Sequence, residues 1–139
     1  MKFKVIAAIS VILAIIVASC QSEEQMEYQR YYNGGKILYE KHCQNCHNAN
    51  GQGLSSLIPP LTDSVYLRAN GAKLACMVKY GINETIIKIN GKAYEGAMPA
   101  TDLAPIEIAK VLTYVNNSFG NKMGLTDVDQ VGEDLSMCK

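Results

Sequence analysis

Five consecutive residues, Cys43-Gln44-Asn45-Cys46-His47, constrain this 139-residue chain more than any other feature of its sequence. The pattern C-x-x-C-H is the attachment signal of c-type haem. The spacing has a mechanical cause, because two cysteine sulfurs bond to the two former vinyl groups of the porphyrin and the next residue brings an imidazole beneath the iron. The motif therefore predicts one covalently attached haem c, with Cys43 and Cys46 as the attachment points and His47 as an iron ligand.

Three other uses of two close cysteines fit the sequence less well. A thioredoxin-like dithiol needs a preceding strand and a βαβ context, which the residues around the motif do not suggest. A zinc site would need a second pair of ligands at similar spacing, and Cys76 and Cys138 do not form one. A disulfide between Cys43 and Cys46 would leave the adjacent His47 unexplained.

A single histidine leaves the sixth coordination position of the iron to be filled. The one other histidine, His42, stands too close to the attachment site to reach the opposite face of the haem. Among the methionines, Met98 fits best, because in Gly96-Ala97-Met98-Pro99 the small residues allow close approach to a flat macrocycle and the proline stiffens the loop. Met98 is therefore predicted to be the second iron ligand. The alternatives are Met77, Met123 and Met137.

The N-terminus has the pattern of a targeting signal. Two lysines precede an apolar run from Val5 to Val17, and a basic start with a short apolar stretch and small residues is typical of a secretory signal peptide. The run is shorter than the roughly 20 residues that span a bilayer, which favours a signal peptide over a membrane-spanning helix. The alternative is an uncleaved N-terminal anchor helix. Val17-Ala18-Ser19-Cys20 resembles the bacterial lipobox, so residues 1–19 are predicted to be removed and Cys20 to carry the lipid that anchors the protein to a membrane.

Processing of this kind would place the protein outside the cytoplasm, facing the periplasm or the cell exterior, which is also where c-type haem is attached. Lys and Arg number 13 and Asp and Glu number 13, so the formal charge is zero, and this balance argues against nucleic-acid binding. Residues 20–29 are polar and acidic, and are predicted to form a flexible tether. Residues 30–139 show no internal repeat and are predicted to form one domain.

Helical periodicity dominates this domain. Apolar and small residues recur on one face over residues 29–43, which predicts a helix that ends at the motif. Other helical segments are predicted over residues 63–69, 72–80, 105–119 and 126–135. Residues 86–89 with the following Asn90-Gly91 predict a short extended piece and a tight turn. The predicted fold class is therefore all-α, with four to five short helices around one haem.

Several motifs outside the haem attachment site resemble the small soluble class of bacterial mono-haem cytochrome c. They are Gly35-x-x-x-Tyr39, Asn50-Gly51-Gln52-Gly53, Pro59-Pro60-Leu61, the Met98 loop, Leu112-Thr113-Tyr114-Val115 and Asn117-Ser118-Phe119-Gly120-Asn121. The resemblance runs from about Gly34 to Phe119. It implies the cytochrome c fold, in which the first and last helices cross at a small residue, here Gly35, with Tyr39 and Tyr114 packed beside it. One departure is Ala104, where relatives usually have a serine or threonine cap.

The resemblance also implies roles for two residues near the motif. The carbonyl of Pro59 is expected to accept the ring N–H of His47, a bond that would orient the histidine and make it a stronger ligand. Leu61 is expected to pack on the haem.

The implied function is that of a one-electron carrier, because histidine and methionine together leave the iron no vacancy for a substrate. No catalytic residue is expected, and the protein is not predicted to be an enzyme. The expected partners are redox proteins such as a respiratory oxidase, reductase or dehydrogenase. The alternatives are a haem-bearing subunit of a larger oxidase or reductase complex and, less favoured, a ligand-binding haem sensor or peroxidase.

Two cysteines, Cys76 and Cys138, remain once Cys20 is assigned to the lipid and Cys43 and Cys46 to the haem. Leftover thiols in an oxidising compartment are more often paired than free. A bridge would fix the C-terminal tail to the domain and close a loop worth about 3–4 kcal/mol in the chain-entropy view. The alternative is two unpaired thiols, one buried and one at a frayed end.

Overall fold

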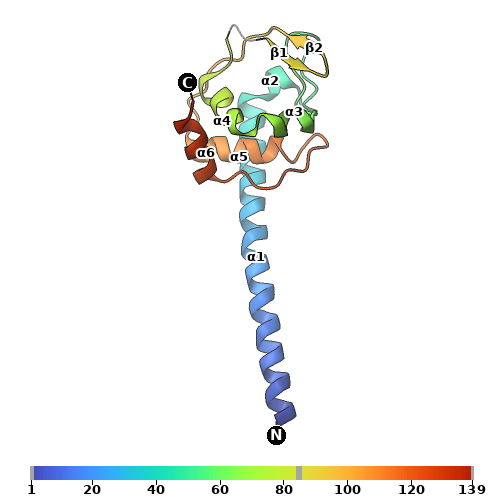
Figure 1. Ribbon diagram of the computed structural model, residues 1–139, viewed down its shortest axis with the longest axis vertical. Helices are drawn as coiled ribbons and strands as arrows, with labels where there is room; N and C mark the ends of the chain where they lie inside the picture. The colour runs from blue at the N-terminus through green and yellow to red at the C-terminus, as the bar shows by residue number, and fades with distance from the viewer. Residues whose placement is uncertain (1, 84–85, 139) are drawn as a thin grey trace. The chain divides into compact units, whose positions relative to one another are not determined.

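The structure is a computed structural model that describes residues 2–83 and 86–138, without the side chains of residues 17–22. It divides into two compact units, Met1–Arg30 and Tyr31–Lys139. In chain order, the elements are α1 (Lys2–His42), α2 (Gln44–His47), α3 (Ser64–Ala69), α4 (Gly71–Tyr80), β1 (Ile87–Ile89), β2 (Lys92–Tyr94), α5 (Pro105–Val115) and α6 (Val128–Ser136) (Figure 1).

The first unit consists of the N-terminal part of α1. Its backbone is helical through residues 20–29, where the sequence analysis expects a flexible tether. The reason is composition, because residues 18–33 contain no glycine or proline and are rich in the good helix formers Glu, Gln, Met and Arg. In the described part of the chain, no helix combines the length and the apolar character needed to cross a bilayer. The predicted lipid acceptor, Cys20, has a side chain outside the described residues, so its modification stays a prediction.

The second unit is mostly helical, as the periodicity predicts, and adds one small sheet. β1 and β2 pair antiparallel, with Ile87 opposite Tyr94 and Ile89 opposite Lys92. Asn90 and Gly91 connect them with φ angles of 49° and 77°, the left-handed conformations that a two-residue hairpin turn requires. The described residues form six helices, one more than the five helical segments that the sequence predicts; the additional one is the single turn of α2, which is too short to give a periodic signal.

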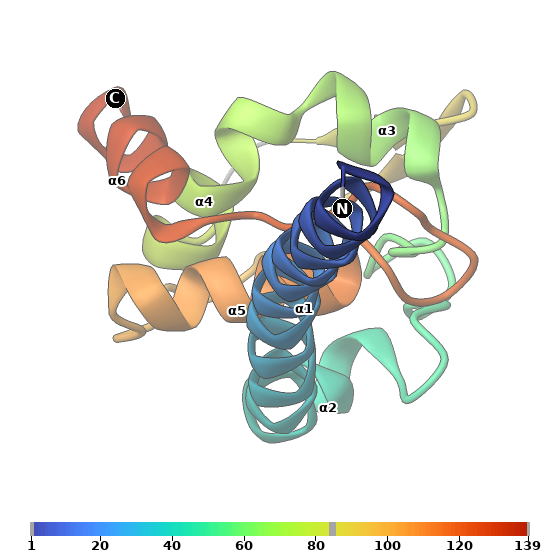
Figure 2. The same cartoon turned by 90° about the horizontal axis from the view of Figure 1, so that it is seen from below.

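The crossing of α1 with α5 organises this unit (Figure 2). A Cβ atom on Gly35 would lie 2.6 Å from the carbonyl carbon of Lys110 and 2.9 Å from the Cβ of Tyr114. Backbone therefore meets backbone at this point, and only glycine fits. On either side of the crossing, aromatic rings fill the angle between the helices: Tyr114 has its ring centroid 5.2 Å from that of Tyr32 and 5.3 Å from that of Tyr39.

The start of α5 lacks a capping side chain, as the sequence predicts for Ala104. The carboxylate of Glu107 compensates in part, because its Oε2 accepts the backbone N–H of Ala104 at 2.9 Å. This is the half of a capping box that does not depend on the residue at the cap position. Pro105 at the first helical position supplies a preset φ angle.

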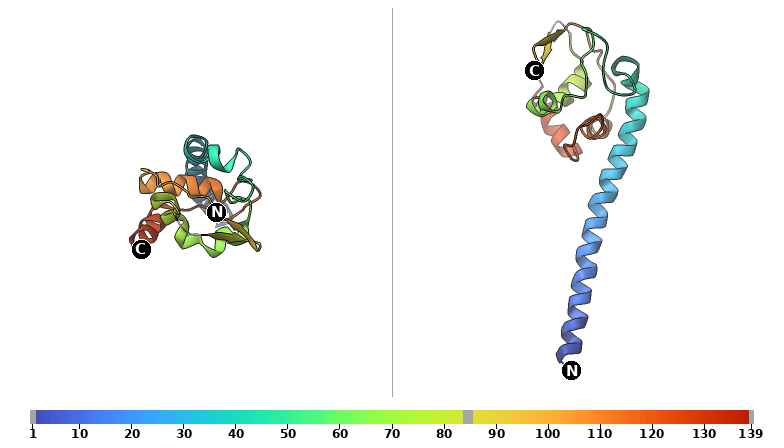
Figure 3. Two further views of the ribbon diagram at one scale, coloured as in Figure 1. Left: turned by 90° about the horizontal axis from the view of Figure 1, so that it is seen from above. Right: turned by 90° about the vertical axis from the view of Figure 1, so that its right-hand side faces the viewer.

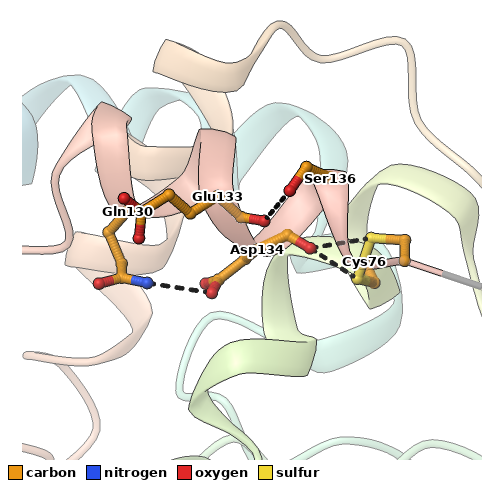
Figure 4. Close-up of a disulfide and its surroundings, with 6 residues drawn as sticks. Cys76, Gln130, Glu133, Asp134 and Ser136 are labelled. Carbon is orange, nitrogen blue, oxygen red and sulfur yellow. Dashed lines mark hydrogen bonds between the residues drawn. A yellow bond between two sulfur atoms is a disulfide. The ribbon is translucent and has the colours of Figure 1, made fainter.

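The C-terminal helix α6 packs against α4 and α5, and a disulfide joins Cys76 of α4 to Cys138 (Figures 3 and 4). The cysteine count predicted this bridge. The two Cα atoms are 5.7 Å apart, within the usual range. The carbonyl oxygen of Asp134 lies 3.6 Å from the Sγ of Cys76 and 3.5 Å from that of Cys138. The tail after α5 is thus fastened to the domain at its far end.

The helix crossing yields the first prediction. Replacing Gly35 by alanine should lower the free energy of unfolding of the haem-loaded protein by about 1–3 kcal/mol, because the new methyl group collides with a backbone carbonyl that cannot rotate away. Gly34→Ala is the matched control, since its Cβ would meet only the flexible side chain of Lys110, at 3.2 Å from Cδ. Chemical denaturation measures both variants. Equal stability of the two would contradict the close crossing.

The disulfide yields the second prediction. Alkylation of the haem-loaded protein under denaturing, non-reducing conditions should leave Cys76 and Cys138 unmodified, and prior reduction should expose both. Cys138→Ser should lower the free energy of unfolding by about 4 kcal/mol, the chain-entropy value for a closed loop of this length. Reduced wild-type protein is the control and should match the variant. Two alkylated thiols without reductant would rule the bridge out.

Candidate functional site

A cavity of about 1000 Å³, counted with the solvent at its mouth, lies in the second unit. The wall is mostly aliphatic and comes from the motif, the loop after it, α3, α4, the hairpin, the Met98 loop and α5. The residues that line it include Cys43, Cys46, His47, Pro59, Pro60, Leu61, Leu67, Leu74, Met77, Val78, Ile82, Ile89, Met98, Val111, Leu112 and Val115.

The two motif cysteines line this cavity from the turn that follows α1. The N–H of Cys43 donates to the carbonyl of Tyr39, and the N–H of His47 donates to the carbonyl of Cys43, both at 2.9 Å. One tight turn therefore presents both sulfurs and the imidazole on the same side. Cys43 is half-buried and Cys46 is exposed, and the two are not bonded to each other.

The environment of Cys43 disfavours the dithiol and zinc alternatives. Burial, followed by the neighbouring Cys46, raises the pKa of the Cys43 thiol to about 11. A thioredoxin-like nucleophile needs the opposite shift. The residue before the motif belongs to a helix and not to a strand. Among the described residues, no group of three or more His, Cys, Asp and Glu side chains is placed to hold a metal ion.

His47 is buried and held by one ring nitrogen. Its Nδ1 lies 3.1 Å from the carbonyl oxygen of Pro59, the contact that the family resemblance implies. A carbonyl can only accept, so Nδ1 carries the proton and the lone pair is on Nε2. Burial lowers the pKa of the imidazole, with the Pro59 bond acting in the opposite direction. A neutral imidazole with a fixed tautomer and Nε2 available is the form that binds a metal.

The loop between His47 and Leu61 is locked by backbone contacts. Gly53 donates its N–H to the His47 carbonyl at 3.0 Å, and Leu61 donates to the carbonyl of Gly51 at 2.7 Å. Gly53 has φ +67°, and a Cβ there would lie 2.7 Å from the Pro59 carbonyl oxygen. A side chain at this position would push away the acceptor of His47. The Pro59-Pro60-Leu61 segment is therefore held at the cavity wall.

Met98 lines the cavity from the segment after the hairpin. Its N–H donates to the carbonyl of Ile82 and its carbonyl accepts the N–H of Ile82, both at 2.9 Å. Gly81 permits this pairing, because a Cβ at that position would lie 2.7 Å from the Ala100 nitrogen. Thr101 fastens the next residues to α4 through its hydroxyl, which donates to the Val78 carbonyl at 2.9 Å. The backbone around Met98 is thus set by α4.

The other methionines differ in their relation to the cavity. Met77, one of the alternative ligands that the sequence offers, also lines the cavity, from α4, and packs against the core as well. Leu74 lies one turn before Met77 on the same helix and also lines the cavity, so the helical spacing of these two apolar residues was the signal available in the sequence. Met123 packs against the core instead, and Met137 is exposed. His42 lies at the rim of the cavity with an exposed side chain.

These residues fit a flat, apolar, covalently held macrocycle. Two thiols and a neutral imidazole come from one turn, a thioether comes from another segment, and aliphatic side chains supply the rest of the wall. A methionine sulfur and a histidine imidazole are a common pair of ligands for iron in haem proteins. The chemistry of the donor set therefore agrees with haem c.

Comparison with known proteins points the same way. Residues 32–119 match the family model for Cytochrome c. Two proteins from Thermus thermophilus, both named cytochrome c-552, are each 33% identical to this chain over 94 residues. The alignment covers 64% of this chain and 70% and 62% of the two relatives. The region matched by the family model includes the haem attachment motif, Pro59, Leu61 and Met98.

Proposed function

Because this chain belongs to the cytochrome c family, we propose that it is a one-electron carrier that works outside the cytoplasm between respiratory redox proteins. The family and the C-x-x-C-H motif mean that the protein carries covalent haem c. When bound, haem c supplies an iron centre that gains and loses one electron. In this proposal, His47 and Met98 would hold the iron of that haem.

One observation carries the proposal: a fixed neutral histidine and a backbone-locked methionine line the same apolar cavity. With two ligands from the protein, the iron would have no open position for a substrate. Methionine also raises the reduction potential relative to harder ligands. Both properties suit a carrier and not an enzyme.

The protein residues have separate tasks in this scheme. Cys43 and Cys46 form the thioether bonds. Pro59 holds the Nδ1–H of His47, which fixes the direction of Nε2 and increases its strength as a donor. Leu61 and the other aliphatic side chains keep water from the cavity. Because the ring of His47 and the backbone of Met98 are already held by hydrogen bonds, little of the chain would have to rearrange during electron transfer.

A sensor or peroxidase function receives less support. Such proteins need a ligand that dissociates and polar groups beside the open position. Both backbone polar groups of Met98 are paired with Ile82. Among the described residues that line the cavity, none is an arginine and the polar side chains other than the motif are His42, Tyr66 and Thr101.

We also propose that Cys20 anchors the protein to a membrane through its lipid. The support is the lipobox-like Val17-Ala18-Ser19-Cys20 after a basic, apolar N-terminus. Haem attachment of this type requires export, so the two signals agree. A lipid anchor would keep the carrier close to membrane-bound redox partners.

The third prediction tests the axial methionine. Met98→Ala should abolish the weak sulfur-to-iron absorption band near the red end of the spectrum of the oxidised protein, and it should lower the reduction potential. Met77→Leu is the matched control, because Met77 also lines the cavity; it should keep the band. Loss of the band in the Met77 variant alone would transfer the ligand role to Met77. Wild-type protein without a reversible one-electron couple would contradict the carrier function itself.

The fourth prediction tests the anchor. Cys20→Ser should release the domain from membranes or leave an unprocessed precursor, whereas Ser22→Ala, two residues beyond the predicted lipid acceptor, should remain membrane-bound and processed. Fractionation and intact-mass analysis measure both. Cleavage that leaves an unmodified Cys20 would show that the protein is not a lipoprotein.

A further inference from the structure

A buried amide outside the cavity connects two parts of its wall. Asn121 follows the end of α5 and is 2% exposed. Its Nδ2 donates to the carbonyl of Leu61 at 2.8 Å and to the carbonyl of Val115 at 3.0 Å. Leu61 belongs to the loop after the haem motif and Val115 is the last residue of α5, and both line the cavity. One side chain thus ties the loop to the helix across 60 residues of sequence.

The orientation of this amide is determined by its partners. A flipped amide would place Oδ1 against two carbonyl oxygens, so the donor must face them. In the described structure, the buried Oδ1 has no hydrogen-bond donor. The amide is therefore oriented by its two donated bonds, which join the loop to the helix.

Leu61, which Asn121 holds, is two residues from Pro59, whose carbonyl accepts the hydrogen bond of His47. Leu61 is held from both sides, because its N–H donates to Gly51 and its carbonyl accepts from Asn121. Proline at positions 59 and 60 removes much of the freedom between these contacts and the Pro59 carbonyl. That carbonyl lies 3.1 Å from the Nδ1 of His47. A shift of Leu61 would therefore be transmitted to the His47 bond.

We propose that Asn121 is a positioning residue for the haem: by clamping Leu61 to the end of α5 it holds the Pro59 carbonyl against His47 and so sets the donor strength of the axial imidazole. The inference rests on the proposed ligand role of His47. Loss of the clamp lengthens the N–H···O bond, which makes the imidazole a poorer donor to oxidised iron. The reduced state is then favoured, and the reduction potential rises.

The same segment offers a matched control. Nδ2 of Asn117 also donates to two carbonyls, those of Thr113 at 2.8 Å and Gly124 at 2.7 Å, and its Oδ1 accepts the N–H of Gly124 at 2.9 Å. None of these partners is among the described residues that line the cavity. Asn117 therefore joins α5 to the segment after it with a similar pair of amide bonds, but without a connection to His47.

The test compares Asn121→Leu with Asn117→Leu in the haem-loaded protein. Asn121→Leu should raise the reduction potential, and exchange of the His47 Nδ1 proton, followed by NMR in the reduced state, should become about tenfold faster or more, as expected when a buried bond network loses a partner. Asn117→Leu should leave both unchanged while lowering stability. If Asn121→Leu takes up no haem, Asn121→Ser replaces it, because its smaller side chain leaves space for water at the two carbonyls.

Two outcomes would overturn the inference. An unchanged potential and unchanged proton exchange in the Asn121 variant that holds haem would reduce Asn121 to a structural brace, and so would equal changes in the Asn117 variant. Failure of the proposed function is recognised separately, because the wild-type protein itself would then lack a low-spin haem spectrum or a reversible one-electron couple.

Discussion

The backbone contact between Gly35 and Lys110 sets the distance between α1 and α5, and the site depends on that distance. α1 ends at the residue before the haem attachment motif, while α5 supplies Val111, Leu112 and Val115 to the wall of the cavity. The space available to the macrocycle is therefore fixed by how closely the two helices approach. The rings of Tyr39, Tyr114 and Phe119, with centroids 5.3 to 5.8 Å apart, fill the angle that the crossing leaves.

Backbone carbonyls take the place of charged groups in controlling the proposed ligands. Pro59 holds His47, and Ile82 pairs with Met98. An apolar cavity has a low dielectric constant, so each of these neutral bonds is stronger than it would be in water and no buried countercharge is required. An ion pair at such a position would carry a large desolvation cost. Neutral, preformed bonds hold the ring of His47 and the backbone of Met98 in place, which would suit the proposed electron transfer.

Short sequence motifs predicted those features of the fold that depend on a few neighbouring residues. The Asn90-Gly91 turn depends on a few adjacent residues, and the structure has it where the sequence indicates. The motif residues and Met98 line one cavity, while the role of Met98 as iron ligand stays a prediction. The lipid acceptor Cys20 stays a prediction. The polar residues 20–29 predict a flexible tether, but most of them are straight-chain helix formers, and the backbone there is helical. The contact between Asn121 and Leu61 could not be predicted, since 60 residues separate the partners and an asparagine after a helix usually belongs to a turn.

The disulfide stabilises the wall of the cavity from outside and places no side chain in the cavity. Cys76 and Met77 are consecutive in α4, and consecutive helical side chains point about 100° apart. Cys76 consequently faces α6 and joins Cys138, while Met77 faces the cavity. The bridge holds α4 from outside, and α4 in turn holds the Met98 segment through Val78 and Thr101. The Cys76–Cys138 disulfide thus supports the segment that carries the proposed iron ligand Met98 indirectly, through the packing of α4.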